Sequence, residues 1–85
     1  MPYQVVLKRS AEKELDSLPN KIRRRITNRL LVLEGNPRPP GSLKIQGAKA
    51  YRLRVGDYRI LYTIDDEANE VIIYSVGHRR DVYRP

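Results

Sequence analysis

The stretch RLRVGDYRI, residues 52–60, constrains the fold more than any other, because Gly56-Asp57 separates two segments of alternating character. A two-residue loop of this composition joins antiparallel strands in a tight β-hairpin, and its length fixes which residues face each other. We therefore predict strands over residues 51–55 and 58–64, with Arg54 directly opposite Arg59. Side chains alternate between the two faces of a sheet, so the core face carries Tyr51, Leu53, Val55, Tyr58, Ile60 and Tyr62. The opposite face carries Arg52, Arg54, Arg59 and Leu61.

Two helices are predicted between a first strand, residues 2–9, and the hairpin. Ser10 is a typical N-cap for the first helix, and Pro19 ends it because the residue before a proline is biased away from the helical region. The second helix begins near Asn20 or Lys21. Gly35 fits the position just after its last turn, and Pro37 prevents its continuation. Its apolar stripe consists of Ile22, Ile26, Leu30 and Leu33. Four arginines lie largely off that stripe: Arg23, Arg24, Arg25 and Arg29.

The remaining segments complete a small mixed fold. Residues 35–50 contain three prolines and three glycines and are predicted to form a loop, whereas residues 65–70 form a polar turn. The apolar run 71–76 has the pattern of a strand buried on both faces, and Gly77 ends it. The order β-α-α-β-β-β predicts one α+β domain over residues 1–85, with a helical hairpin packed on one face of a mostly antiparallel sheet. The other face is left for solvent or a ligand.

The net charge of the chain limits the classes of partner that it is expected to bind. The formal net charge is +7, and 12 of the 17 basic residues are arginine. A small basic domain usually meets a polyanion, an acidic protein or an anionic membrane surface, and arginine suits bidentate contact with phosphate. The alternative is that the charge only keeps the protein soluble.

Several classes are excluded or disfavoured. Without cysteine there is no disulfide framework, thiolate metal site or thiol nucleophile. The start of the chain lacks the apolar segment of a signal peptide, and no run approaches the length of a membrane span, so we expect a cytoplasmic protein with no membrane partner. We also expect no metal site, because the acidic residues gather in the turn at 65–70 and in the first helix, with no histidine nearby.

The arginines of the hairpin point to an anion. Like charges directly opposite each other oppose strand pairing, so the fold has little reason to place Arg54 across from Arg59 with Arg52 on the same face. A binding site for an anion would explain why these arginines are placed together. The alternative is a solvated face on which water and salt screen the repulsion. The assignment depends on register, because a bulge at Gly56 would turn one strand over.

Three stretches of the chain carry a resemblance to a known family. They are YQVVLKRSAEKELDSLP near the start, AYRLRVGDYRILYTI around the hairpin, and VIIYSVGHRRDVYR at the end. Together they resemble the RelE toxins of the RelE/ParE superfamily of bacterial and archaeal toxin–antitoxin systems, and the resemblance covers essentially the whole chain. The more specific signals are the basic residues of the second strand, the Tyr-Arg of GDYRI and the closing GHRRDVY.

The resemblance implies a type II toxin that is a ribosome-dependent endoribonuclease. Such toxins enter the ribosomal A site and cut mRNA by attack of a ribose 2′-OH on the neighbouring phosphate, with no metal ion or other cofactor. By position, Arg52 and Arg54 match two basic residues, Arg59 matches the arginine that braces the phosphate, and Arg79 matches a leaving-group acid or charge stabiliser. Tyr83 matches a tyrosine that stacks on a base. The implied partner is a RelB-like antitoxin with an acidic or amphipathic segment, in a hetero-oligomer.

The general base stays open between two residues. Arginine stays protonated at any physiological pH and is therefore a poor base, so Arg52 and Arg54 are expected to act by electrostatics. His78 stands where the best-known member of the family has a lysine, and histidine exchanges protons near neutral pH. We hypothesise that the proton transfers shift toward His78 or Tyr83. The predicted catalytic residues are thus Arg52, Arg54, Arg59, His78, Arg79 and Tyr83.

Other basic residues are candidates for contact with the RNA backbone: Arg23, Arg24, Arg25, Lys44, Lys49, Arg80 and Arg84. For those on the second helix, a solvated helix face is the alternative. Three other functions remain in view: a gyrase-inhibiting toxin of the ParE kind, a non-catalytic RNA- or antitoxin-binding module, and a simple DNA-binding protein. The closing GHRRDVYR argues against the first, and the filled site positions argue against the second.

Overall fold

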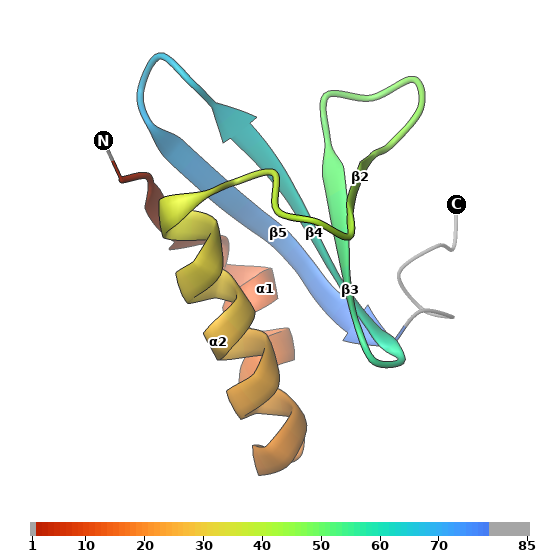
Figure 1. The fold of residues 1–85 in the computed structure, drawn as a ribbon. Helices are drawn as coiled ribbons and strands as arrows, with labels where there is room; N and C mark the ends of the chain where they lie inside the picture. The colour runs from red at the N-terminus through yellow and green to blue at the C-terminus, as the bar shows by residue number, and fades with distance from the viewer. Residues whose placement is uncertain (1, 79–85) are drawn as a thin grey trace.

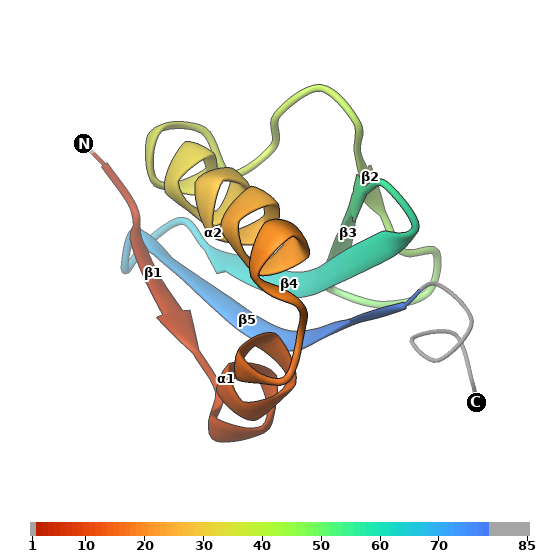
Figure 2. The ribbon, with the colours of Figure 1, turned by 90° about the horizontal axis from the view of Figure 1, so that it is seen from below.

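The computed structural model describes residues 2–78, so the predicted site residues Arg79, Arg80, Tyr83 and Arg84 lie outside the described residues. Two helices pack on one face of an open five-stranded sheet (Figures 1 and 2). The elements are β1 (Gln4–Leu7), α1 (Arg9–Asp16), α2 (Asn20–Gly35), β2 (Ser42–Lys44), β3 (Tyr51–Val55), β4 (Tyr58–Asp65) and β5 (Glu70–His78).

The sheet has the strand order β1-β5-β4-β3-β2, in which β1 runs parallel to β5 and every other pair is antiparallel. The two helices connect β1 to the antiparallel strands that follow, and they bring the chain across one face of the sheet. Strand β1 can therefore lie beside β5 and run parallel to it. The predicted α+β class with a mostly antiparallel sheet is confirmed.

One apolar core lies between the helices and the sheet. It joins Ala11 of α1 to Ile26, Leu30 and Leu33 of α2 and to the inward residues of the strands, which are Leu53, Val55, Ile60, Tyr62, Val71, Ile73 and Val76. These positions recur at every third or fourth residue in α2 and at every second residue in β3 and β4, so the period of the sequence places them on one side of each element.

The hairpin has the predicted register. Arg54 pairs with Arg59 and Val55 pairs with Tyr58. Gly56 has φ of +61°, which the first central residue of a type II′ turn requires and which a glycine adopts without strain. Because this turn adds no extra residue, the two strands keep the faces that their alternation assigns.

Strand β5 differs from the expectation for residues 71–76. Its inward residues are buried, but the intervening Ile72, Tyr74 and Ser75 are only half-buried, so the strand is not buried on both faces. A β-bulge interrupts the pairing, because Leu61 pairs with Ser75 while Tyr62 pairs with Ile73. The strand also continues through Gly77 to His78, since both residues still pair with β4.

Two further predictions were wrong in detail. Residues 35–50 do not form a loop throughout, because residues 42–44 form the edge strand β2 along β3. The first helix begins at Arg9, and Lys8 holds the N-cap position in place of Ser10. The carbonyl of Lys8 already accepts the N–H of Glu12 at 2.9 Å, which draws Ser10 into the first turn.

The segment after α2 is tied to the sheet by two polar contacts. The buried Tyr62 hydroxyl donates to the carbonyl of Pro37 at 2.8 Å. Arg38 forms an ion pair with Asp66 at 2.8 Å, and the Tyr3 hydroxyl donates to the same carboxylate at 2.6 Å. The Arg38 guanidinium, with help from Tyr3, holds the pKa of Asp66 below its usual range. These contacts fix where the chain enters β2.

Candidate active site

Three arginines lie on the sheet face away from the helices, and we call Arg52, Arg54 and Arg59 the arginine face. Arg54 is exposed, whereas Arg52 and Arg59 are half-buried and the Nε atom of Arg59 is buried. Together with Gly41 and Leu43 the three line a cavity of about 160 Å³. The structure thus brings together the three strand residues that the sequence predicted.

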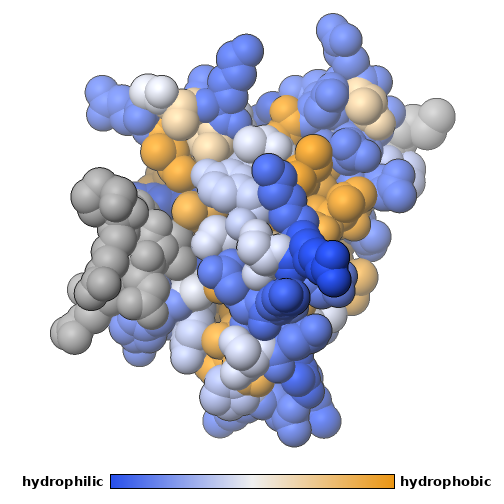
Figure 3. All heavy atoms as spheres, turned by 180° about the vertical axis from the view of Figure 1, so that it is seen from behind, coloured by the Kyte–Doolittle hydropathy of each residue, from blue (hydrophilic) through white to orange (hydrophobic). Residues whose placement is uncertain are grey.

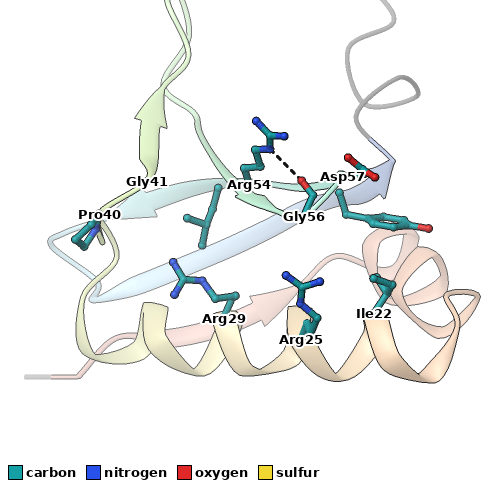
Figure 4. A pocket seen from close by; sticks show the side chains of 10 residues that line it. Ile22, Arg25, Arg29, Pro40, Gly41, Arg54, Gly56 and Asp57 are labelled. Atoms are coloured by element: carbon teal, nitrogen blue, oxygen red, sulfur yellow. Dashed lines mark hydrogen bonds between the residues drawn. The ribbon is translucent and has the colours of Figure 1, made fainter.

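The turn also orients one of these side chains. The Nε–H of Arg54 donates to the carbonyl of Gly56 at 3.0 Å. Since the type II′ turn fixes that carbonyl, the Arg54 guanidinium is held beside the turn (Figure 4). A fixed cation of this kind loses little freedom when it meets an anion, which is the advantage of preorganisation.

His78 lies on the other face of the sheet. It pairs with Tyr58, and the two rings make an edge-to-face contact with centroids 5.5 Å apart. Tyr58 is adjacent to Arg59 in the strand, so Tyr58 and His78 share the helix-covered side. Simple alternation from Val71 would place His78 with the arginines, but the bulge at Leu61/Tyr62 in the β4–β5 pairing reverses the faces beyond it.

The end of β5 has a further support that the sequence did not reveal. The backbone N–H of Val76 donates to the carboxylate of Glu14 at 3.0 Å. Strand β1 pairs with β5 only as far as Ile73, and α1 takes over beside the strand beyond that point. Glu14 therefore satisfies an edge N–H two residues before His78.

The candidate RNA-binding residues separate into distinct places. Arg25 lines a cleft of about 560 Å³ between α2 and the hairpin, with Arg29 and Arg54 also in its lining (Figure 4). Arg23 and Arg24 line a different cavity, of about 320 Å³, beside α1. Arg23 is also bonded locally, to the side chain of Asn20 and to a backbone carbonyl of α1.

Two candidate lysines lie near β2. Lys44 lines a cavity of about 350 Å³ together with Arg52, next to the arginine face. Lys49 is exposed in the connection between β2 and β3. Viewed from behind Figure 1, the surface is largely hydrophilic with separate apolar patches (Figure 3).

Within residues 2–78, no three His, Asp or Glu side chains gather closely enough to hold a metal ion. Over the same residues, no helix has both the length and the apolar character that crossing a membrane requires.

Comparison with known proteins gives consistent matches. A family model described as "ParE toxin of type II toxin-antitoxin system, parDE" matches residues 5–83. Toxin RelG of Mycobacterium tuberculosis is 37% identical over 86 residues, which cover 99% of this chain and 99% of the relative. The toxin–antitoxin complex RelBE2 from the same organism aligns with a TM-score of 0.80, at 33% identity over 93% of this chain and 100% of that chain. The archaeal RelE–RelB complex from Pyrococcus horikoshii aligns with a TM-score of 0.83, at 30% identity over 93% of this chain and 97% of that chain.

The fold and these matches define the class, a toxin of a type II toxin–antitoxin system. The chain belongs to the RelE/ParE superfamily, as a RelE-type toxin. The family resemblance that the sequence carries is therefore confirmed.

Proposed function

We propose that this toxin is a metal-independent endoribonuclease that cuts mRNA at the ribosomal A site. The observation that carries the proposal is the arginine face, where Arg54 stands directly opposite Arg59 with Arg52 beside them. This placement works against strand pairing, and it provides three fixed cations around one small cavity. An anion that gains charge during a reaction is the ligand that such a site stabilises best.

The reaction proposed is transfer within the RNA chain. The 2′ oxygen of one ribose forms a bond to the neighbouring phosphorus, the bond from phosphorus to the 5′ oxygen breaks, and the products carry a 2′,3′-cyclic phosphate and a 5′-hydroxyl. One proton leaves the 2′-OH and one reaches the 5′ oxygen. Between these events the phosphate carries extra negative charge, and the guanidinium groups of Arg52, Arg54 and Arg59 stabilise it.

The proton transfers need other groups. Arginine stays charged at any physiological pH, so the arginine face supplies charge and no base. The proposed candidates are His78 and Tyr83, and the position of His78 beside Tyr58 favours Tyr83 for steps at the arginine face. On this account, His78→Ala keeps the wild-type rate and pH dependence in single-turnover cleavage, whereas Tyr83→Phe slows it. A His78→Ala variant that is slow and has lost the acidic limb of the pH profile would instead assign the base to His78.

The proposed partner is a RelB-like antitoxin. The aligned structures of the M. tuberculosis and P. horikoshii relatives are toxin–antitoxin complexes. A chain of net charge +7 attracts an acidic or amphipathic segment, and such a segment would neutralise the toxin by covering the arginine face. We expect a hetero-oligomer of the two proteins.

Single-turnover cleavage of mRNA on purified, programmed ribosomes tests the activity. Replacing Arg59 with alanine should slow cleavage by about 10²–10³-fold, the usual effect of removing one group that stabilises developing charge. The control is Arg9→Ala on α1, which removes an equal charge from an exposed position away from every cavity described above. Equal rates for wild type and Arg59→Ala would contradict the proposal.

A gyrase poison is the second candidate, because the family model that matches residues 5–83 is described as a ParE toxin. Purified gyrase, plasmid DNA and the toxin distinguish the two functions. Trapped DNA cleavage complexes would support the gyrase function, and their absence together with ribosomal mRNA cleavage supports the nuclease.

A further inference from the structure

Two cavities of this protein lie next to each other at the edge of β3. The small cavity of the arginine face and the larger cleft beneath the hairpin share two lining residues, Gly41 and Arg54. Strand β2 begins at Ser42, which pairs with Leu53, so β3 extends past the end of β2 at Arg54. At that point no strand within residues 2–78 covers the edge. We call the two adjacent cavities together the basic groove.

The inner half of the basic groove carries two arginines from one side of α2. Arg25 and Arg29 are four residues apart, which places them one above the other on the helix. Both side chains point from α2 toward the hairpin, whereas Arg54 projects from the hairpin on the side away from α2 (Figure 4). The three cations therefore approach the rim of the hairpin from both sides of the sheet.

The turn organises these cations. A Cβ atom built on Gly56 would lie 3.4 Å from Arg25 Nη1, so the Arg25 guanidinium packs against the bare α-carbon of the turn. The carbonyl of the same Gly56 accepts the Nε–H of Arg54. One glycine thus contacts a cation on each side of the hairpin.

We propose that the basic groove holds a second stretch of the RNA chain, with Arg25 and Arg29 contacting a backbone phosphate away from the cut bond. This inference rests on the proposed function, in which RNA occupies the arginine face. Among the residues that the structure describes, five arginines and one carboxylate, that of Asp57, line the basic groove, so a ligand that extends from the arginine face into the cleft meets cations along its length. An extended chain with regularly spaced negative charges fits this arrangement, and single-stranded nucleic acid is bound in grooves of this kind.

An acidic protein segment is the competing occupant, and the test includes it. Fluorescence anisotropy measures binding of the purified chain to a labelled 2′-O-methyl octanucleotide, which cannot be cut through a 2′-OH. Arg25→Gln and Arg29→Gln should each weaken binding roughly fivefold, as expected for one charge contact that water can reach. Each should also reduce the steepness of log affinity against log salt by about 0.7, the value for one phosphate contact on a single strand. The control Arg9→Gln removes the same charge outside the groove and should change affinity by less than about twofold.

The outcomes separate this inference from the proposed function. Equal losses for Arg9→Gln and Arg25→Gln would mean that only net charge matters, and would overturn it. Losses confined to binding of a labelled glutamate-rich peptide would also overturn it and identify a protein-docking groove. If the wild type does not cut mRNA while the groove variants still lose oligonucleotide binding, the proposed nuclease function is wrong, but the inference that the basic groove binds RNA is supported. Thermal unfolding of each variant checks that it folds.

Discussion

Replacing Arg54 with glutamine should make the protein more stable and less active at once. In the β3–β4 ladder Arg54 stands directly opposite Arg59, where favourable pairs contribute roughly 0.2–1 kcal/mol and like charges destabilise the pairing. The variant also loses the 3.0 Å bond from Arg54 to Gly56, but Arg54 is exposed, so water replaces most of that bond. We expect a net gain of about 0.5 kcal/mol. In a domain of this size the gain raises the melting temperature by about 2–4 °C.

Thermal unfolding followed by circular dichroism measures this gain. Salt screens the repulsion, since the Debye length falls from about 10 Å at 0.1 M to about 3 Å at 1 M. The difference in melting temperature between Arg54→Gln and wild type should therefore shrink as salt rises. Lys49→Gln removes one charge from an exposed loop position with no strand partner, and its melting temperature should stay close to that of wild type.

Activity should move in the opposite direction. Removing one of the three cations that we propose to surround the reacting phosphate should slow single-turnover cleavage by about 10²-fold. Two results would show that repulsion between Arg54 and Arg59 does not destabilise the protein. One is an Arg54→Gln variant that is less stable than wild type at low salt, and the other is a difference in melting temperature that does not change with salt. The pairing of Arg54 with Arg59 would then no longer indicate a site built for an anion.

Three further perturbations test how the structure holds the site. Tyr62→Phe removes the buried hydroxyl that donates to the Pro37 carbonyl and should lower the free energy of unfolding by about 1–2 kcal/mol in urea titrations. Asp66→Asn should destabilise the protein at neutral pH. Because Arg38 lowers the pKa of Asp66, wild type loses this contribution as pH falls through that lowered pKa, so the two melting temperatures should converge in acid. Gly56→Ala strains a residue at φ +61° and should cost roughly 1–3 kcal/mol by thermal unfolding.

The first two of these predictions have outcomes that would contradict them, and the third has a matched control. Unchanged urea midpoints in Tyr62→Phe would mean that Pro37 finds another donor. If the melting temperatures of Asp66→Asn and wild type differ by the same amount at low pH, the loss of the carboxylate charge does not cause the lower stability of the variant. Gly47→Ala is the control for Gly56→Ala, because Gly47 has φ of +80° but no atom within 4 Å of an added Cβ. It should cost stability without changing oligonucleotide binding, whereas Gly56→Ala should change both.

The hairpin shows how much of the fold follows from local chemistry. A two-residue loop with glycine at its first position permits one register, so the arginine face was predictable from residues 52–60. Strand β2 was not predictable, because three residues among prolines and glycines carry no usable period. It forms because the edge of β3 offers it partners.

The candidate site was less predictable because two of its features depend on packing. The face on which His78 lies is set by a bulge in β5, and nothing in the sequence of the apolar run marks that bulge. The spacing of Arg25 and Arg29 predicts that they share a side of α2, but only the packing of α2 against the sheet shows that this side meets the hairpin. Arg23 and Arg24, adjacent in sequence, line another cavity for the same reason.

The central claim is that this toxin cuts mRNA at the arginine face. Mapping mRNA 5′ ends after induced expression of the toxin tests the claim most directly. We predict growth arrest and new 5′ ends inside translated codons in cells that express the wild type, and neither in cells that express Arg59→Ala. Arg79→Ala should behave in the same way. Growth arrest by Arg59→Ala without new 5′ ends, or arrest by the wild type without them, would contradict the claim.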